Sequence, residues 1–437
     1  MKSRKISGSF KRAIILGELF FFVFLILIFF ALVKGDLFGG DGEIKPAEST
    51  SSPTAFLEES AEATPFLEEL LSSLTPTPRP TIIYEGGVSY PTALPESVAT
   101  PMDTSPSFLP EGINPLTGRA PSSLELLERR PVAIKIAIYP RSNRPVSGVN
   151  RADVVFEYYI EGGLTRFIAL FYGDNAAEVG PVRSGRFFDE HVARMYQSYL
   201  VLKFADPRVL NYLKSTDISR FLVLPSIGTC PPFYIGRYQR DTYNNVFFDT
   251  TRFSDCLAKK GMDDARPALN VGYFSMMPPD SAENISRIYA RYSSDNYHYW
   301  GYDSNLQQYH RYQEKDDIRE GNSPDYALLT DALTGNGIAT DNLIYLFVPH
   351  TFENDDHERS EIYHIDLFGE GDAVLFRDGR VIPAYWQRFA VEQPLLIMDR
   401  NRMPLPLKNG RVFYEVFGEN STYTQENGQA FFEFETP

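Results

Sequence analysis

Residues 152–174 read ADVVFEYYIEGGLTRFIALFYGD, and this stretch decides the fold class. Two runs rich in β-branched and aromatic residues, 152–162 and 165–174, lie on either side of Gly162–Gly163. A Gly-Gly pair between two such runs predicts a β-hairpin with a tight turn. This hairpin places a β-sheet near the start of the folded part of the chain.

The neighbouring segments alternate between strands and short helices. RPVAIKIAI (130–138) and YLVLKF (199–204) have the composition of buried strands. Apolar spacing predicts three helices. Asp206 is an N-cap residue for one of them, and Gly261 is a C-terminal stop signal for another. The predicted helices cover residues 184–197, 207–214 and 250–261.

After Pro267 the pattern changes to short strands separated by turns such as RDGR (377–380) and KNGR (408–411). Frequent turns of this kind are typical of an antiparallel sheet. The sequence therefore predicts an α+β fold. An N-terminal α/β-type subdomain over 112–266 is followed by a mainly antiparallel β subdomain over 267–437.

The N-terminal region predicts a membrane anchor and a spacer. Residues 13–33 form an apolar run with one charge, long enough to cross the roughly 30 Å core of a bilayer as a helix. Basic residues precede it, so residues 1–12 are expected in the cytoplasm and the body outside. The run is too long for a cleaved signal peptide, and no small-x-small cleavage site follows it. Residues 34–111 are rich in Ser, Thr and Pro and predict a disordered linker.

The charge distribution excludes some partners. The formal net charge is −15; residues 1–34 contribute +5, so the rest of the chain carries −20. A body this acidic argues against a nucleic-acid binder and against docking on anionic lipid heads. The two cysteines, Cys230 and Cys256, stand in no zinc motif, and whether they form a disulfide stays open at this point.

Charged residues gather around the hairpin. Glu157 and Glu161 are four residues apart on one predicted strand, so both are expected on one face. Arg166 is expected to pair with Glu161 across the hairpin. Arg183 and Arg186 lie at a predicted helix start, where guanidinium and free N–H groups bind anions. The candidate ligand-binding set is Glu157, Glu161, Arg166, Arg183, Ser184, Arg186 and Asp206.

Three functions remain open for this set. The leading hypothesis is an extracytoplasmic envelope protein whose body binds a cell-wall component, a peptide or another envelope protein through an Arg/Glu pocket. The alternative is an envelope hydrolase that uses Glu157 or Glu161 together with Asp206, since two acids across a cleft suffice for glycoside cleavage. The third is a scaffold in which the charges only form a structural ion-pair network.

Two further patterns have a purely structural interpretation that competes with a functional one. His350, His357 and His364 flank an acidic loop, but their spacing matches no known ligand set, so neither a metal nor a cofactor is expected. Residues 289–312 are dense in Tyr and Trp. Such rings stack on sugars, yet alternating Tyr in antiparallel strands is more often cross-strand packing.

Motifs in both halves resemble the YerB-like lipoprotein family. They include NPLTG (114–118), VGPVRSGR (179–186) and DALTGNGIATDNLIYLFV (331–348), besides the opening hairpin. The resemblance implies a membrane-attached bacterial protein on the outside of the cytoplasmic membrane. It implies no reaction, because the family is one of unknown function. Members usually carry a lipobox cysteine, whereas this chain has an apolar segment instead.

Overall fold

The computed structural model describes most of the chain beyond residue 108. The described ranges are 109–236, 245–269, 273–279, 283–318, 323–353 and 361–436, together with the backbone of the short strands β1 (Ile83–Tyr84) and β2 (Val88–Ser89). The predicted tail 1–12, the anchor 13–33 and the linker up to 108 otherwise lie outside the described residues. None of the described helices has the length and apolar character needed to cross a bilayer.

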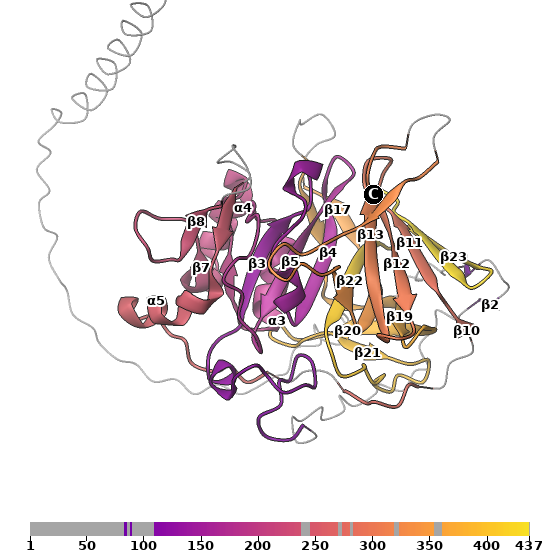
Figure 1. The fold of residues 1–437 in the computed structure, drawn as a ribbon, viewed down its shortest axis with the longest axis horizontal. Helices are drawn as coiled ribbons and strands as arrows, with labels where there is room; N and C mark the ends of the chain where they lie inside the picture. Colours follow the sequence, from indigo (N-terminus) through magenta and orange to yellow (C-terminus); the bar gives the residue numbers. More distant parts are fainter. Residues whose placement is uncertain are drawn as a thin grey trace, which may run out of the picture. The chain divides into compact units, whose positions relative to one another are not determined.

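The larger sheet, here called the first sheet, draws strands from both halves of the described chain (Figure 1). Its strand order is β10-β20-β19-β16-β22-β4-β5-β3-β6-β7, and β21 pairs with β20. Its members from the N-terminal half are β3 (Val132–Ala137), β4 (Val154–Glu161), β5 (Leu164–Phe171), β6 (Tyr199–Val201) and β7 (Leu222–Val223). Those from the C-terminal half are β10 (Glu283–Asn284), β16 (Asn342–Val348), β19 (Gly369–Arg377), β20 (Arg380–Arg388), β21 (Leu396–Met398) and β22 (Val412–Gly418).

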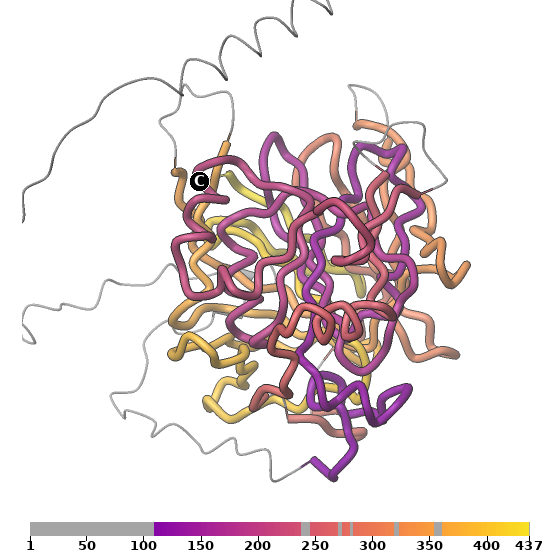
Figure 2. The backbone as a smooth tube through the Cα atoms, turned by 90° about the vertical axis from the view of Figure 1, so that its left-hand side faces the viewer, coloured from indigo at the N-terminus to yellow at the C-terminus, as the bar shows by residue number. Residues whose placement is uncertain are grey.

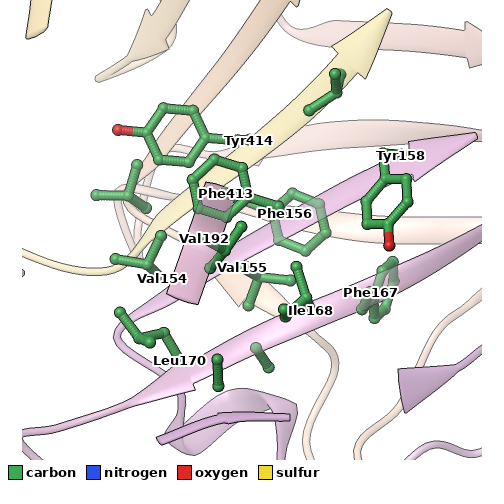
Figure 3. Packing of buried hydrophobic residues seen from close by; sticks show 14 of the residues in the cluster. Val154, Val155, Phe156, Tyr158, Phe167, Ile168, Leu170, Val192, Phe413 and Tyr414 are labelled. Carbon is green, nitrogen blue, oxygen red and sulfur yellow. The ribbon is translucent and has the colours of Figure 1, made fainter. Parts of the chain in front are cut away.

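The join between the two halves lies at β4 and β22. These strands pair in parallel, with Val154 opposite Val412, and Figure 2 shows early and late segments of the chain within one body. Figure 3 shows Phe156 of β4 beside Tyr414 of β22, and the two rings stack at 4.5 Å. Residues on both sides of the predicted boundary at 266/267 therefore share one sheet.

The second sheet packs on one face of the first. Its order is β14-β13-β12-β11-β24-β23, with β15 beside β13. Trp300 lies 4.8 Å from Phe413, and Tyr345 stacks on Phe432 at 3.7 Å, so aromatic side chains fill the layer between the sheets. The strands are β11 (Arg287–Arg291), β12 (Tyr297–Asp303), β13 (Gln308–Glu314), β14 (Tyr326–Leu328), β15 (Ala339–Thr340), β23 (Thr422–Glu426) and β24 (Gln429–Glu433).

Helices are few among the described residues. The α-helices are α3 (Phe188–Met195), α4 (Pro207–Ser215) and α5 (Phe253–Lys260). Short 3-10 helices are η2 (Leu124–Glu128), η3 (Arg141–Asn143), η4 (Val149–Arg151), η5 (Asp217–Phe221) and η6 (Thr250–Arg252), and two short antiparallel pairs are β8 (Phe233–Ile235) with β9 (Val246–Phe248) and β17 (His350–Phe352) with β18 (Tyr363–Ile365). Helix α3 covers the other face of the first sheet, where Phe188 contacts Phe156. The prediction of an α+β fold is thus confirmed only in part, because strands dominate and the helices are short.

Local signals placed most of these elements correctly. Gly162 and Gly163 both have positive φ and form the predicted hairpin turn. Asp206 caps α4 by accepting the Arg208 backbone N–H, and Gly261 ends α5 in the left-handed conformation.

The helix predicted over 184–197 is shorter than expected and begins at Phe188. The preceding residues run extended between β3 and the segment after β6. The Arg183 N–H donates to the Lys135 carbonyl at 3.0 Å, and the Gly185 N–H donates to the Phe204 carbonyl at 2.8 Å. A Cβ atom at Gly185 would meet a methyl group of Leu202 at 2.5 Å, so a larger residue here would force Leu202 to shift.

Cys230 and Cys256 form a disulfide, with Cα atoms 5.5 Å apart. The bond ties the loop before β8 to helix α5. Disulfides persist mainly in oxidising compartments, which fits a body outside the cytoplasm.

Removing this disulfide should lower stability. The bond closes a loop across 26 residues of sequence, so a Cys230→Ser/Cys256→Ser variant should lose about 3–4 kcal/mol of unfolding free energy by the loop-entropy relation. Urea unfolding checks the value. Reductant should destabilise the wild type but leave the double variant unchanged; an effect of reductant on both would contradict this assignment.

Candidate functional site

Most of the predicted site residues meet at one place, here called the arginine cluster: Arg166, Arg183 and Arg186 with Glu161. Glu161 Oε1 lies 2.6 Å from Arg186 Nη2 and 3.8 Å from Arg166 Nη2. The predicted Glu161–Arg166 pair therefore exists, but Arg186 is the closer partner. Arg183 is near enough for its charge to act on Arg166.

A β-bulge positions Glu161. In the β4–β5 pairing, Tyr159 faces Thr165 and Glu161 faces Leu164, so Ile160 is an extra residue on β4. Side chains alternate along a strand, and an extra residue reverses the alternation beyond it. Glu161 therefore turns to the face that carries Arg166, away from the face of Glu157.

The cluster is buried on the guanidinium side and open on the carboxylate side. Arg166, Arg183 and Arg186 are 8%, 9% and 8% exposed, whereas the Glu161 side chain is 37% exposed. Burial, followed by repulsion from Arg186 and Arg183, lowers the pKa of Arg166 to about 9. Arg186 Nε is buried without a hydrogen-bond partner among the described residues. The arrangement holds crowded cations that an additional anion would relieve.

Backbone groups fix the guanidinium positions. Arg166 Nη1 donates to the Ser184 carbonyl at 2.8 Å, and Arg186 Nη1 donates to the Gly185 carbonyl at 3.0 Å. The Arg186 backbone N–H donates to Asp189 Oδ2 at 2.8 Å. This backbone N–H, near the predicted helix start, was expected to be free to bind an anion. It donates instead to a side chain of α3, so that part of the prediction is corrected.

Asp206 stands close to the cluster as the cap of α4. Burial alone would raise the pKa of Asp206, but hydrogen bonds from the Arg208 side chain and backbone outweigh burial and lower this pKa, with a further contribution from Arg186. Its carboxylate is thus engaged mainly with Arg208, at 3.1 Å from Nε.

A buried triad that the sequence reasoning missed lies beneath the cluster. Lys135 of β3 contacts the hydroxyl of Tyr158 and lies 3.2 Å from Asp189 Oδ1, while Tyr158 donates to the same oxygen at 2.5 Å. Burial lowers the pKa of Lys135 to about 7; Asp189 opposes this shift, and the charges of Arg166 and Arg186 add to it. The one signal in the sequence is a lone charge in the middle of the apolar run RPVAIKIAI.

Glu157 belongs to a different environment, here called the inter-sheet junction: Glu157, Arg311 and Glu415. Arg311 Nη1 lies 2.5 Å from Glu157 Oε2 and 2.9 Å from Glu415 Oε1, and all three side chains are fully buried. Burial raises the pKa of both carboxyls, against the lowering effect of Arg311. The expectation that Glu157 shares a face with Glu161 is therefore wrong, and the hydrolase hypothesis keeps only Glu161 with Asp206.

The junction also bears on metal binding. Ligand atoms of Glu157, His298 and Glu415 lie within 4.8 Å of one another, a spacing that a cation could bridge. Arg311 already supplies the cation between the two carboxylates, and His298 Nε2 contacts Glu415 Oε1 at 2.9 Å. Trp300 Nε1 donates to the same oxygen. An ionic and hydrogen-bonded junction accounts for these side chains without a metal.

The other histidines do not gather into a ligand set in the described part of the chain. His350 Nδ1 lies 2.8 Å from the Val348 carbonyl, and His364 contacts Glu353 at 2.5 Å and stacks on Phe187. His357 lies outside the described residues.

Three tyrosines of the Tyr- and Trp-rich segment, Tyr289, Tyr299 and Tyr312, form a cross-strand row on the outer face of the second sheet, whereas Trp300 lies between the sheets. Tyr299 stacks on Tyr312 at 4.6 Å with planes 4° apart, and Tyr289 stacks on Phe431 at 5.1 Å. These rings cover one another's faces, which a sugar ring would need for stacking. The contacts therefore favour the packing interpretation.

A cavity of about 1030 Å³ lies elsewhere, between the NPLTG segment, the start of β4 and the β12–β13 and β14–β15 loops. No residue of the arginine cluster lines this cavity. No pattern in the sequence predicts this cavity, because its lining residues come from segments far apart along the chain.

Comparison with known proteins gives a family and a fold. Residues 116–263 match the N-terminal domain of a family described as "Protein of unknown function (DUF3048)", and residues 288–413 match its C-terminal domain. "Putative lipoprotein YerB" of Bacillus subtilis (strain 168) is 27% identical over 277 residues, 63% of this chain and 77% of that protein. The crystal structure of the Bacillus subtilis YerB protein matches with a TM-score of 0.56 at 22% identity, covering 70% of this chain and 96% of that chain.

Replacing Lys135 by Met should flatten the pH dependence of stability above neutrality. The folded pKa of about 7 lies below the ordinary value of 10.5, so between pH 7 and 10 the unfolded chain binds more protons at this site and stability rises with pH. From pH 7 to 9 the wild type should gain about 2 kcal/mol relative to Lys135→Met. Urea unfolding at both pH values measures this difference, and parallel profiles would disprove it.

Removing Arg311 should leave two buried carboxylates unpaired. Arg311→Met should lose about 3–5 kcal/mol of unfolding free energy, whereas Arg311→Met/Glu157→Leu/Glu415→Leu should recover most of this loss. Lys315→Met, which breaks a solvent-exposed pair with Asp325, is the matched control and should change stability by under about 1 kcal/mol. Equal losses of unfolding free energy in Arg311→Met and the control would show that the junction stabilises the fold no more than an exposed ion pair.

Proposed function

Because this chain belongs to the DUF3048 family and is similar to "Putative lipoprotein YerB" of Bacillus subtilis, we propose that it is an extracytoplasmic envelope protein anchored in the membrane by residues 13–33. Its body binds the anionic part of an envelope ligand at the arginine cluster. The ligand is a cell-wall component, a peptide or another envelope protein that carries a carboxylate or phosphate. Three features support the location: the apolar run 13–33, the disulfide between Cys230 and Cys256, and the description of the relative.

One observation carries the binding proposal: Arg166 and Arg186 share a single half-exposed carboxylate, Glu161. Buried guanidinium groups that are only partly neutralised destabilise the folded protein. An incoming anion would restore the balance, and it would gain charge-assisted hydrogen bonds from groups already held by backbone carbonyls.

Glu161 indicates how such an anion would be received. Its Oε1 atom already occupies a position 2.6 Å from Arg186 Nη2, which is the geometry of a charge-assisted hydrogen bond. Since Glu161 comes from the end of β4 and is partly exposed, a ligand carboxylate or phosphate can compete with it from the solvent side. The internal carboxylate then acts as a stand-in for the ligand.

The experiment is a thermal melt of the full-length protein in a neutral detergent, titrated with phosphate, sulfate and acetyl-D-alanyl-D-alanine. Sodium chloride at matched ionic strength separates specific binding from screening. Wild type should gain melting temperature with at least one of these anions beyond the chloride curve. Arg186→Gln should abolish the gain, and Glu161→Gln should enlarge it, because the competing carboxylate is gone.

Arg266→Gln is the matched control, since Arg266 forms an exposed pair with Glu128 away from the cluster. It should keep the wild-type response. Loss of the response in Arg266→Gln as well as Arg186→Gln, or the absence of any anion effect beyond chloride, would refute the binding proposal. A drop in melting temperature in Arg186→Gln with no anion response in either protein would instead identify the cluster as a scaffold.

A further inference from the structure

The cavity near the start of β4 differs in its chemistry from the arginine cluster. It measures about 1030 Å³, the upper end of the range for ligand pockets. Its walls combine N-terminal segments, such as 119–122 and 150–153, with C-terminal residues such as Gln308 and Arg411. It therefore lies on the join between the two domains that the family models match, a common position for a binding site.

The charges around this cavity are already balanced. Arg119 pairs with Asp341 at 2.9 Å, and Arg151 pairs with Asp174 at 2.8 Å. Arg411 donates to the carbonyl and the side-chain oxygen of Asn150. Asn150 is neutral, but the charges of Asp341, Asp331 and Asp153 act on Arg411. Acidic side chains therefore offset the guanidinium groups, and a carboxylate or phosphate ligand would gain little here.

The polar side chains are planar and held in place. Asn150 donates to the Gly337 carbonyl at 3.0 Å and accepts from the Ala339 N–H at 3.3 Å, and Gln308 donates to Asp341 at 3.1 Å. Fixed amides and guanidinium groups present hydrogen-bonding edges at low entropic cost. His310 lines the same cavity, and its buried Nε2 has no hydrogen-bond partner in the described part of the chain.

Three leucines supply apolar surface next to these polar groups. Leu306, Leu328 and Leu333 line the cavity and are 60%, 42% and 37% exposed. They give a ligand in this cavity apolar surface to pack against beside the polar groups. A fatty chain would require apolar walls throughout, whereas more than half of the lining residues here are polar or charged.

From this combination we propose that the cavity binds an uncharged saccharide. A sugar ring has hydroxyl groups around its rim, which suit the fixed amides and guanidinium edges, and C–H groups on its faces, which suit the leucines. Neutral charge, planar polar walls and aliphatic patches all fit this one class of ligand. The proposal is independent of anion binding at the arginine cluster.

The test is isothermal titration of the full-length protein with neutral trisaccharides, in a detergent without a sugar head group. The probes are triacetylchitotriose, maltotriose, cellotriose and mannotriose, with trigalacturonate as the charged comparison. At least one neutral sugar should bind saturably. The variant Leu306→Glu/Leu333→Glu should weaken that binding roughly tenfold or more, a loss of about 1.4 kcal/mol or greater.

Two controls keep this result interpretable. Leu124→Glu changes a leucine that is exposed but lies outside the cavity lining, and it should leave sugar binding unchanged. Arg186→Gln should also leave it unchanged, which separates this site from the arginine cluster. Binding of no neutral sugar, tighter binding of trigalacturonate than of every neutral sugar, or equal weakening by Leu124→Glu would each overturn the proposal.

Discussion

The inter-sheet junction is the interaction on which the rest of the structure depends. Glu157 and Glu415 face each other on neighbouring parallel strands, and Arg311 reaches both from the second sheet. Burying three charges costs several kcal/mol per ion, and only good geometry offsets the cost. A slip of β4 against β22 by one residue would turn Glu157 to the wrong face and leave a charge unpaired. The junction therefore favours one register of the strands and one placement of the sheets.

Local sequence signals predicted the elements but not their long-range pairing. The hairpin at Gly162–Gly163 and the helix ends at Asp206 and Gly261 depend on residues next to one another in the chain, and the structure has them all. The parallel pairing of β4 with β22 has no such signal, because both strands read as apolar runs that many partners would satisfy. For this reason, the predicted division into two successive subdomains did not include the sheet that both halves share.

In the candidate site, too, local sequence signals predicted some contacts, and contacts that depend on long-range pairing were not predicted. The tight hairpin brings Glu161 close to Arg166 as predicted, whereas Arg186 lies beyond the hairpin and reaches Glu161 from the extended segment before α3. The predicted alternation of side chains between the two faces of β4 breaks at Ile160. A β-bulge interrupts it there, and the residue types do not predict a bulge. The roles of Lys135 and Arg311 were not predicted. The role of a charge inside an apolar strand depends on its ion-pair partners, and these lie far away along the chain.

The β4–β22 pairing has a consequence for biogenesis. A ribosome makes β4 about 250 residues before β22, so β4 keeps one unpaired edge until residues 412–418 have emerged. Bare edges recruit strands from other molecules. Chaperone protection would have to last until β22 is available, and a chain terminated before residue 412 would expose this edge and favour aggregation.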